Sequence, residues 1–137
     1  MKNLIPALAI TLSLAIASCV GVAPGNVPVA PDGPVARTIE RVLQRTEAYM
    51  GSEAPPMVIP AEAQGKVAAA IQTARVMTSQ PEASGDVLLV TMSPIMTLHD
   101  SMVQADPSLE QLERDIYLED TARLRSLFQS VNIYAVN

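Results

Sequence analysis

The chain has 137 residues, of which 49% are hydrophobic, with one cysteine, one histidine and no tryptophan. Its nine basic and fourteen acidic side chains give a net charge of −5. This balance argues against nucleic acid as a partner, because binding it relies on Lys and Arg to neutralise phosphates. The length fits one domain and hardly two.

The first eighteen residues have the pattern of a secretory signal peptide. Lys2 provides a positive charge, residues 4–17 are mostly apolar, and small residues close the run. This apolar run is shorter than the ~20 residues that a membrane span needs. A charged start, a short apolar core and a small-residue exit together predict export and cleavage.

The tetrapeptide Ile16-Ala17-Ser18-Cys19 closely resembles the lipobox of bacterial lipoproteins. The resemblance implies that residues 1–18 are a lipoprotein signal peptide, cut before Cys19, whose thiol and new amino group are then acylated. Two or more acyl chains anchor a protein stably, whereas one binds reversibly. Val20 follows in place of Asp, which by this resemblance implies the periplasmic face of the outer membrane. The alternative is an ordinary signal peptide cut elsewhere, with Cys19 unmodified.

Residues 19–33 are predicted to be the acylated cysteine and a Pro/Gly-rich tether. Residues 20–33 contain three prolines and three glycines, which suit neither a helix nor a central strand. A wholly polyproline-like stretch of this length would reach on the order of 40 Å. We therefore expect the tether to hold the periplasmic domain, residues 34–137, off the lipid surface.

Two amphipathic helices are predicted next. One covers about residues 34–50, since Pro34 suits a first helical turn and Gly51 a C-terminal stop. Its apolar positions recur at helical spacing: Val35, Ile39, Val42, Leu43, Tyr49 and Met50. After a proline-rich loop, the second helix spans about residues 61–79. Its expected buried face consists of Val67, Ala70, Ile71, Ala74 and Met77.

The next segment allows two interpretations. Residues 87–92 fit either a buried strand or the start of a helix, because periodicity alone does not distinguish them. Ser93-Pro94 suits an N-cap followed by a first-turn proline, so a helix over about residues 94–104 is predicted either way. As a strand, residues 87–92 would pair with 131–136; as a helix, they would lead into one kinked at Pro94. We favour the helix.

The last helix is predicted to start with Asp106 as its cap and Pro107 as its first residue, and to end near Val131. Its expected buried face is Leu109, Leu112, Ile116, Leu124, Leu127, Phe128 and Val131. Its acidic residues are predicted to form a solvated face: Glu110, Glu113, Asp115, Glu119 and Asp120. The predicted fold class is thus mainly α, a small bundle of about four helices. The alternative is α+β with the short strand pair 87–92/131–136.

His99-Asp100 is the one histidine–carboxylate neighbour pair in the sequence. Adjacent helical residues point about 100° apart, so Asp100 is badly placed to orient the imidazole, and His99 is expected to be partly exposed. With Cys19 acylated, a nucleophile would have to be Ser or Thr, and the sequence contains no Gly-x-Ser-x-Gly turn. We therefore predict neither an enzyme nor a cofactor.

A metal site is the alternative for this helix. The candidate ligands fall within about a third of the circumference of one continuous helix: Met92, Met96, His99 and Met102. Thioether and imidazole together suit Cu(I). The same face also carries Leu88, Ile95 and Val103, so a hydrophobic core with methionine as gap-filler is the favoured interpretation, and no metal is predicted.

The sequence therefore predicts an outer-membrane lipoprotein whose helical domain binds or scaffolds another envelope component, expected to be a protein. The membrane itself would be contacted through the N-terminal lipid. Two alternatives stay open. One is Cu(I) or other metal handling through the methionine–histidine set, and the other is a phage-encoded exclusion or lysis lipoprotein, which would share this anchor and size.

Overall fold

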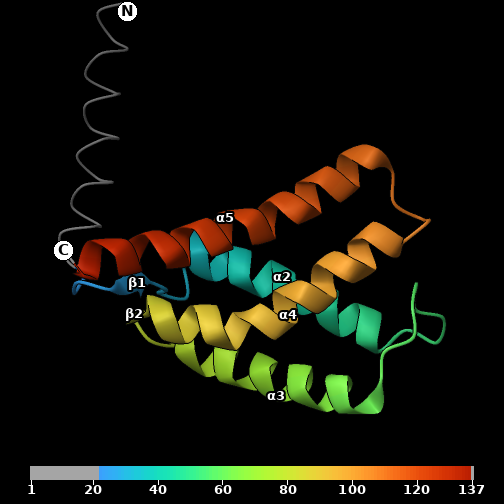
Figure 1. Ribbon diagram of the computed structural model, residues 1–137, viewed down its shortest axis with the longest axis horizontal. Helices are drawn as coiled ribbons and strands as arrows, with labels where there is room; N and C mark the ends of the chain where they lie inside the picture. The colour runs from blue at the N-terminus through green and yellow to red at the C-terminus, as the bar shows by residue number, and fades with distance from the viewer. Residues whose placement is uncertain (1–21, 137) are drawn as a thin grey trace, which may run out of the picture.

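The computed structural model describes residues 22–136, with the backbone alone for 132–136. The described elements are β1 (Asn26–Pro28), α2 (Pro34–Met50), α3 (Ala61–Met77), β2 (Glu82–Ser84), α4 (Gly85–Ala105) and α5 (Gln111–Val136). Helix α4 lies at the centre and packs against α2, α3 and α5 (Figure 1). The predicted mainly α bundle is confirmed, while the signal peptide and Cys19 lie outside the described residues.

Helices α2 and α3 follow the sequence pattern closely. Helix α2 has the predicted bounds, and the Gly51 N–H donates to the Glu47 carbonyl where the helix ends. Helix α3 ends at Met77, two residues before the predicted end. The core joins β1 to the four described helices through Val27, Val29, Ile39, Val42, Leu43, Val67, Ile71, Ala74, Leu88, Met92, Ile95, Met96, Leu124 and Phe128.

Helix α4 runs without a break through Pro94. Its N-cap is Ser84, whose hydroxyl accepts the Val87 N–H, so Ser93 lies inside the helix and does not cap one. Proline has no N–H, so Pro94 leaves the carbonyl of Val90 without its helical hydrogen bond. Pro94 is exposed and Val90 is 75% exposed, so this part of the helix faces water. The helical interpretation of residues 87–92 is therefore confirmed.

The alternative strand pair 87–92/131–136 is wrong, because both segments are helical. The sheet that does form joins β1 to β2 in an antiparallel pair, with Val27 opposite Ala83. Gly25, just before β1, has a φ of 81°, a left-handed conformation that glycine adopts without strain. Its carbonyl accepts the Gly85 N–H at 2.8 Å, which fixes the end of the sheet to the start of α4.

The predicted tether is largely part of the folded domain. Val27 and Val29 are fully buried in the core, and the Val29 N–H donates to the Pro81 carbonyl at 3.0 Å. The prediction that the domain begins at residue 34 is therefore wrong. The physical reason is long-range pairing: β1 bonds a strand more than fifty residues away, and an edge strand accommodates proline at its ends.

Helix α5 begins later than predicted. Asp106 and Pro107 form a turn instead of the helix start, because the Asp106 carboxylate accepts both the N–H and the hydroxyl of Ser108, at 2.9 and 2.6 Å. The first turns of α5 then leave the other helices at the end where α4 and α5 are joined (Figure 1). Leu112 and Ile116, expected to be buried, are accordingly 71% and 51% exposed.

Within residues 22–136, no helix is both long enough and apolar enough to cross a membrane.

Candidate functional site

His99 lies on the buried face of α4, which packs against α5 through this part of its length. Its side chain is 0% exposed, so the expectation of a partly exposed residue is wrong. The face that carries Leu88, Ile95 and Met96 also carries His99, which places the imidazole in the interior. The burial of His99 therefore follows from its place on the apolar stripe of α4 and not from the polarity of its side chain.

The imidazole is oriented by its sequence neighbour. Nδ1 of His99 lies 2.9 Å from Oδ1 of Asp100, so the prediction that Asp100 is badly placed to orient the ring is wrong. The Asp100 carboxylate reaches His99 on one side and Thr121 and Arg125 of α5 on the other, so the difference in direction of the two Cα–Cβ bonds does not prevent the contact. An ionised carboxylate only accepts hydrogen bonds, so Nδ1 carries the proton of this contact.

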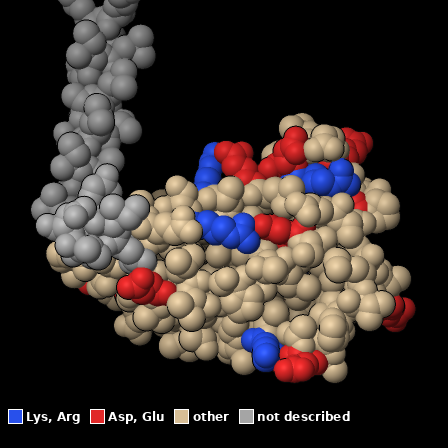
Figure 2. All heavy atoms as spheres, viewed as in Figure 1, with Lys and Arg blue, Asp and Glu red and all other residues tan. Residues whose placement is uncertain are grey.

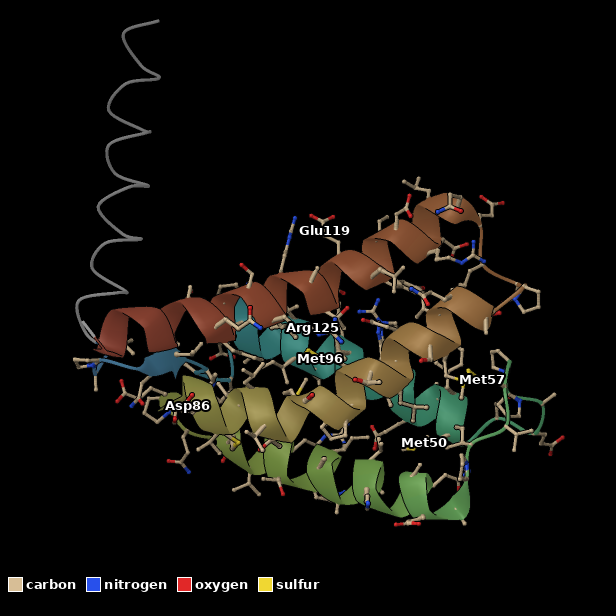
Figure 3. The ribbon with its side chains drawn as sticks, in the orientation of Figure 1. Met50, Met57, Asp86, Met96, Glu119 and Arg125 are labelled. Carbon is tan, nitrogen blue, oxygen red and sulfur yellow. The ribbon has the colours of Figure 1, made fainter. Side chains whose placement is uncertain are left out.

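Helix α5 completes a polar network around Asp100. The Thr121 hydroxyl donates to Oδ1 at 2.7 Å and Arg125 Nη1 donates to Oδ2 at 2.8 Å. Figure 3 shows Arg125 reaching from α5 toward α4. Burial acts to raise the pKa of Asp100, but hydrogen bonds from His99, Arg125 and Thr121 and the charge of Arg125 outweigh it, so the pKa lies below its usual value.

The second ring nitrogen of His99 is left without a partner. Among the side chains that the structure describes, Nε2 is the buried polar atom that makes no hydrogen bond. With the proton on Nδ1, a neutral ring presents a lone pair at Nε2. The arrangement resembles a metal-ligating histidine, which typically donates its other ring N–H to a carboxylate. The Thr121 hydroxyl bonds to Asp100 and to the Leu118 carbonyl, not to this nitrogen.

The three candidate methionines are all fully buried on α4. Met92 and Met102 are ten residues apart, or about 15 Å along the helix axis. A metal–sulfur bond is about 2.3 Å, so these two sulfurs cannot share one ion. The subset Met96, His99 and Met102, spaced three residues apart, is the part of the prediction that helix geometry allows. Within residues 22–136, no three His, Cys, Asp or Glu side chains are grouped to hold a metal.

Asp120 is the acidic residue of α5 for which the predicted solvent exposure is wrong. It is buried, and its carboxylate pairs with Arg41 at 3.1 Å and with Arg45. Arg45 also lies over the Tyr117 ring, 4.2 Å from its centroid. Burial acts to raise the pKa of Asp120, but the hydrogen bonds and charges of the two arginines outweigh it and lower the pKa. The other predicted acids of this face are exposed: Glu110, Glu113, Asp115 and Glu119.

A further ion-pair cluster joins α2 to α3. Arg75 of α3 pairs with Glu40 at 3.0 Å and, through both carboxylate oxygens, with Glu47. The hydrogen bond and charge of Arg75 lower the pKa of Glu47 against the opposing effect of burial. Together with the Asp100 and Asp120 networks, this cluster fixes the helices relative to one another.

The surface carries an apolar groove at the end where α2 and α3 are joined. This groove, called the distal groove below, has a volume of about 360 Å³ and is lined mainly by Met57, Val58, Ile59, Pro60, Val67, Pro94 and Leu98. Val58 is 89% exposed and Met57 43%. On the face that Figure 2 shows, charged side chains gather over α5, whereas fewer lie over α3 and α4. No protein-family model, curated protein or solved structure matches the chain.

Proposed function

We propose that the mature protein is a lipid-anchored lipoprotein of the bacterial outer membrane, and that its periplasmic helical domain binds another envelope protein. The anchor is supported by the lipobox-like residues 16–19. Removal of residues 1–18 takes Lys2 away and leaves eight basic and fourteen acidic side chains, a net charge of −6. This charge disfavours nucleic acid and electrostatic attraction to anionic lipid.

The distal groove is the main structural support for the proposed binding role. Single exposed apolar residues are common on protein surfaces, but here Met57 and Val58 line an apolar groove together with Leu98. A hydrophobic segment of a partner protein fits such a groove, because its apolar side chains would remove these surfaces from water.

The position of the groove favours a partner on the periplasmic side. Its α4 lining lies at residues 94–101, about 14–24 Å along the helix from Gly85. The chain enters the domain at the opposite end, through β1 beside the start of α4 (Figure 1). Under the proposed anchor, the groove therefore faces away from the lipid to which the chain is attached.

Site-specific photo-crosslinking in intact cells tests the partner. A photoreactive amino acid replaces Val58, and the control carries it at Ala122, an exposed position of α5. We expect one discrete cross-linked envelope protein, identified by mass spectrometry, from position 58 and not from position 122. Its yield should fall when Leu98→Asp is added. Equal products from both positions would contradict the binding role of the groove.

The anchor has its own test. Labelling cells with a radioactive fatty acid, followed by membrane fractionation, compares the wild type with Cys19→Ala. We expect label and outer-membrane location in the wild type and loss of both in the variant. Equal incorporation in the two proteins would contradict lipid attachment at Cys19.

A second candidate function, handling of Cu(I), is favoured by one observation: the unpartnered, buried Nε2 of His99. In this proposal Nε2 and the thioethers of Met96 and Met102 bind the ion, and Asp100 fixes the ring. Cu(I) titration against a competing chelator should show tight binding that Met96→Leu removes. Asp100→Asn should weaken it about 10–100-fold, as loss of an outer-shell carboxylate does.

The matched control for the copper site is Met57→Leu, because Met57 lies in the distal groove and not on α4. We expect its affinity for Cu(I) to equal that of the wild type. A wild-type protein that takes no Cu(I) from the chelator would remove the metal function and leave the binding role untouched.

A further inference from the structure

The folded domain begins very close to Cys19. Cys19 and Val22 are three positions apart, so their Cα atoms lie at most about 11 Å from each other. The Ala23 N–H already donates to the Glu82 carboxylate at 3.2 Å, and the Asn26 amide donates to the same carboxylate at 2.9 Å. An acyl chain on Cys19 would therefore hold the β1–β2 end of the domain at the lipid surface.

Apolar side chains are exposed at this same end. Val87 and Val90 occupy the first two turns of α4 on one face, and they are 50% and 75% exposed. Val76, in the last turn of α3, is 66% exposed, and α3 packs against α4 beside β2 (Figure 1). We call these three residues the proximal valines. An apolar groove of about 420 Å³, lined in part by Val22, Pro28 and Leu127, opens beside β1.

We infer that the β1–β2 end of the domain rests on the bilayer, with the proximal valines in contact with the lipid interface. The inference rests on the proposed anchor at Cys19. The short span from Cys19 favours lipid over a protein partner as the occupant of this surface, because Val22, where the described domain starts, lies at most about 11 Å from the acylated residue.

The contact is apolar in character. Asp32, Glu82 and Asp86 lie near this end, and Arg37 follows in the first turn of α2; Figure 3 shows Asp86 at the start of α4. Such a charge balance does not attract anionic headgroups. Binding through valine side chains instead follows the apolar area removed from water, and added salt does not screen it.

Fluorescence depth measurement on the complete, processed protein tests the orientation. Val87→Cys is labelled with an environment-sensitive fluorophore in phosphatidylcholine vesicles that carry spin-labelled lipid. The matched control is Gln104→Cys, exposed on the same helix about 25 Å further along. We expect quenching at position 87 to exceed that at 104 by about threefold or more, since interfacial side chains lie within ~5–10 Å of the headgroup boundary.

Two further measurements complete the test. Adding Val90→Asp to labelled Val87→Cys should bring its quenching down to the level at position 104, whereas 0.5 M salt, far above physiological strength, should not. Because Val90 is exposed, this change is compatible with the fold. Equal quenching at positions 87 and 104 would overturn the inference.

Separate outcomes distinguish the lipid anchor at Cys19 from the membrane contact of the proximal valines. Acylation consumes the Cys19 thiol, so the wild type should take up no thiol-reactive fluorophore and should float with the vesicles. Labelling of the wild type, or failure to float, would overturn the anchor and the inference with it. An unlabelled, floating protein with equal quenching at both positions would overturn the inference alone.

Discussion

Two proline-rich segments of similar composition differ in how much of them is buried in the core. Residues 22–33 contain three prolines, and so do residues 51–60. In the first segment Val27 and Val29 are fully buried, whereas in the second Val58 is almost fully exposed and Ile59 is buried at 8% exposure. Composition alone therefore does not decide which segment joins the core.

The difference lies in their hydrogen-bond partners. Residues 22–33 bond a distant strand: β1 pairs with β2, and the Val29 N–H reaches the Pro81 carbonyl. The bonds found for residues 51–60 are local, such as Gly51 N–H to the Glu47 carbonyl and Ala54 N–H to the Ser52 hydroxyl. The segment with a strand partner brings Val27 and Val29 into the core, whereas the segment with local bonds buries Ile59 and leaves Met57 and Val58 exposed.

The largest expected effect is that of a charge placed in the first segment. Val27→Asp buries a carboxylate without a partner, and we expect it to lower the free energy of unfolding by about 3–5 kcal/mol. The control, Val58→Asp, should change it by less than about 0.5 kcal/mol. Urea denaturation of the two purified variants measures both, and equal stability would contradict the burial of β1.

A smaller effect is expected from removing two methyl groups beside the same strand. Val29→Ala should cost about 2 kcal/mol, from lost apolar burial and the cavity that remains. Val58→Ala, the same change in residues 51–60, should be nearly neutral because Val58 is already exposed to water. A loss at position 58 as large as at 29 would show that both segments are packed.

Acid should act on the helix–helix contacts outside both segments. The pKa of Asp120 is lowered in the folded state, so its contribution to stability is present above the ordinary aspartate pKa of about 3.9 and is lost as pH falls through the lower folded value. We expect Asp120→Asn to cost about 1–2 kcal/mol at pH 7, discounted because Arg41 is half exposed.

The pH dependence provides the control for Asp120. Between pH 5 and pH 3, the wild type should lose more stability than Asp120→Asn, since the variant has no carboxylate at this position to protonate. Thermal unfolding across this range compares the two proteins. Parallel curves would mean that Asp120 gains nothing from Arg41 and Arg45.

The smallest expected effect is a cut in the exposed segment. Limited proteolysis of the native protein should cleave within residues 51–60 before residues 22–33, because exposed loops are preferred cleavage sites. The helices should stay associated after that cut, with little change in far-ultraviolet circular dichroism. Mass spectrometry of the fragments locates the site, and first cleavage within 22–33 would reverse the comparison.

Sequence reasoning worked where structure depends on near neighbours. The bounds of α2 and the buried faces of α2 and α3 follow from apolar spacing over a few turns. It failed for β1, whose partner strand lies more than fifty residues away, and for Leu112, whose spacing fits a helix that extends past its neighbours.

The polar core of the candidate site shows the same limit. The helical stripe correctly placed Met96 among buried residues, yet His99 was expected to be partly exposed. Its partners Thr121 and Arg125 come from another helix, and Asp120 likewise takes its arginines from α2. The arginines at positions 41 and 45, one helical turn apart, are the signal that could have indicated a buried acid opposite them.

The most direct test of the proposed function is the mass of the N-terminal peptide of the natural, purified protein. We predict a peptide that starts at Cys19 and carries two or three acyl chains. A free thiol on Cys19, or an N-terminus at any other residue, would contradict the lipid anchor.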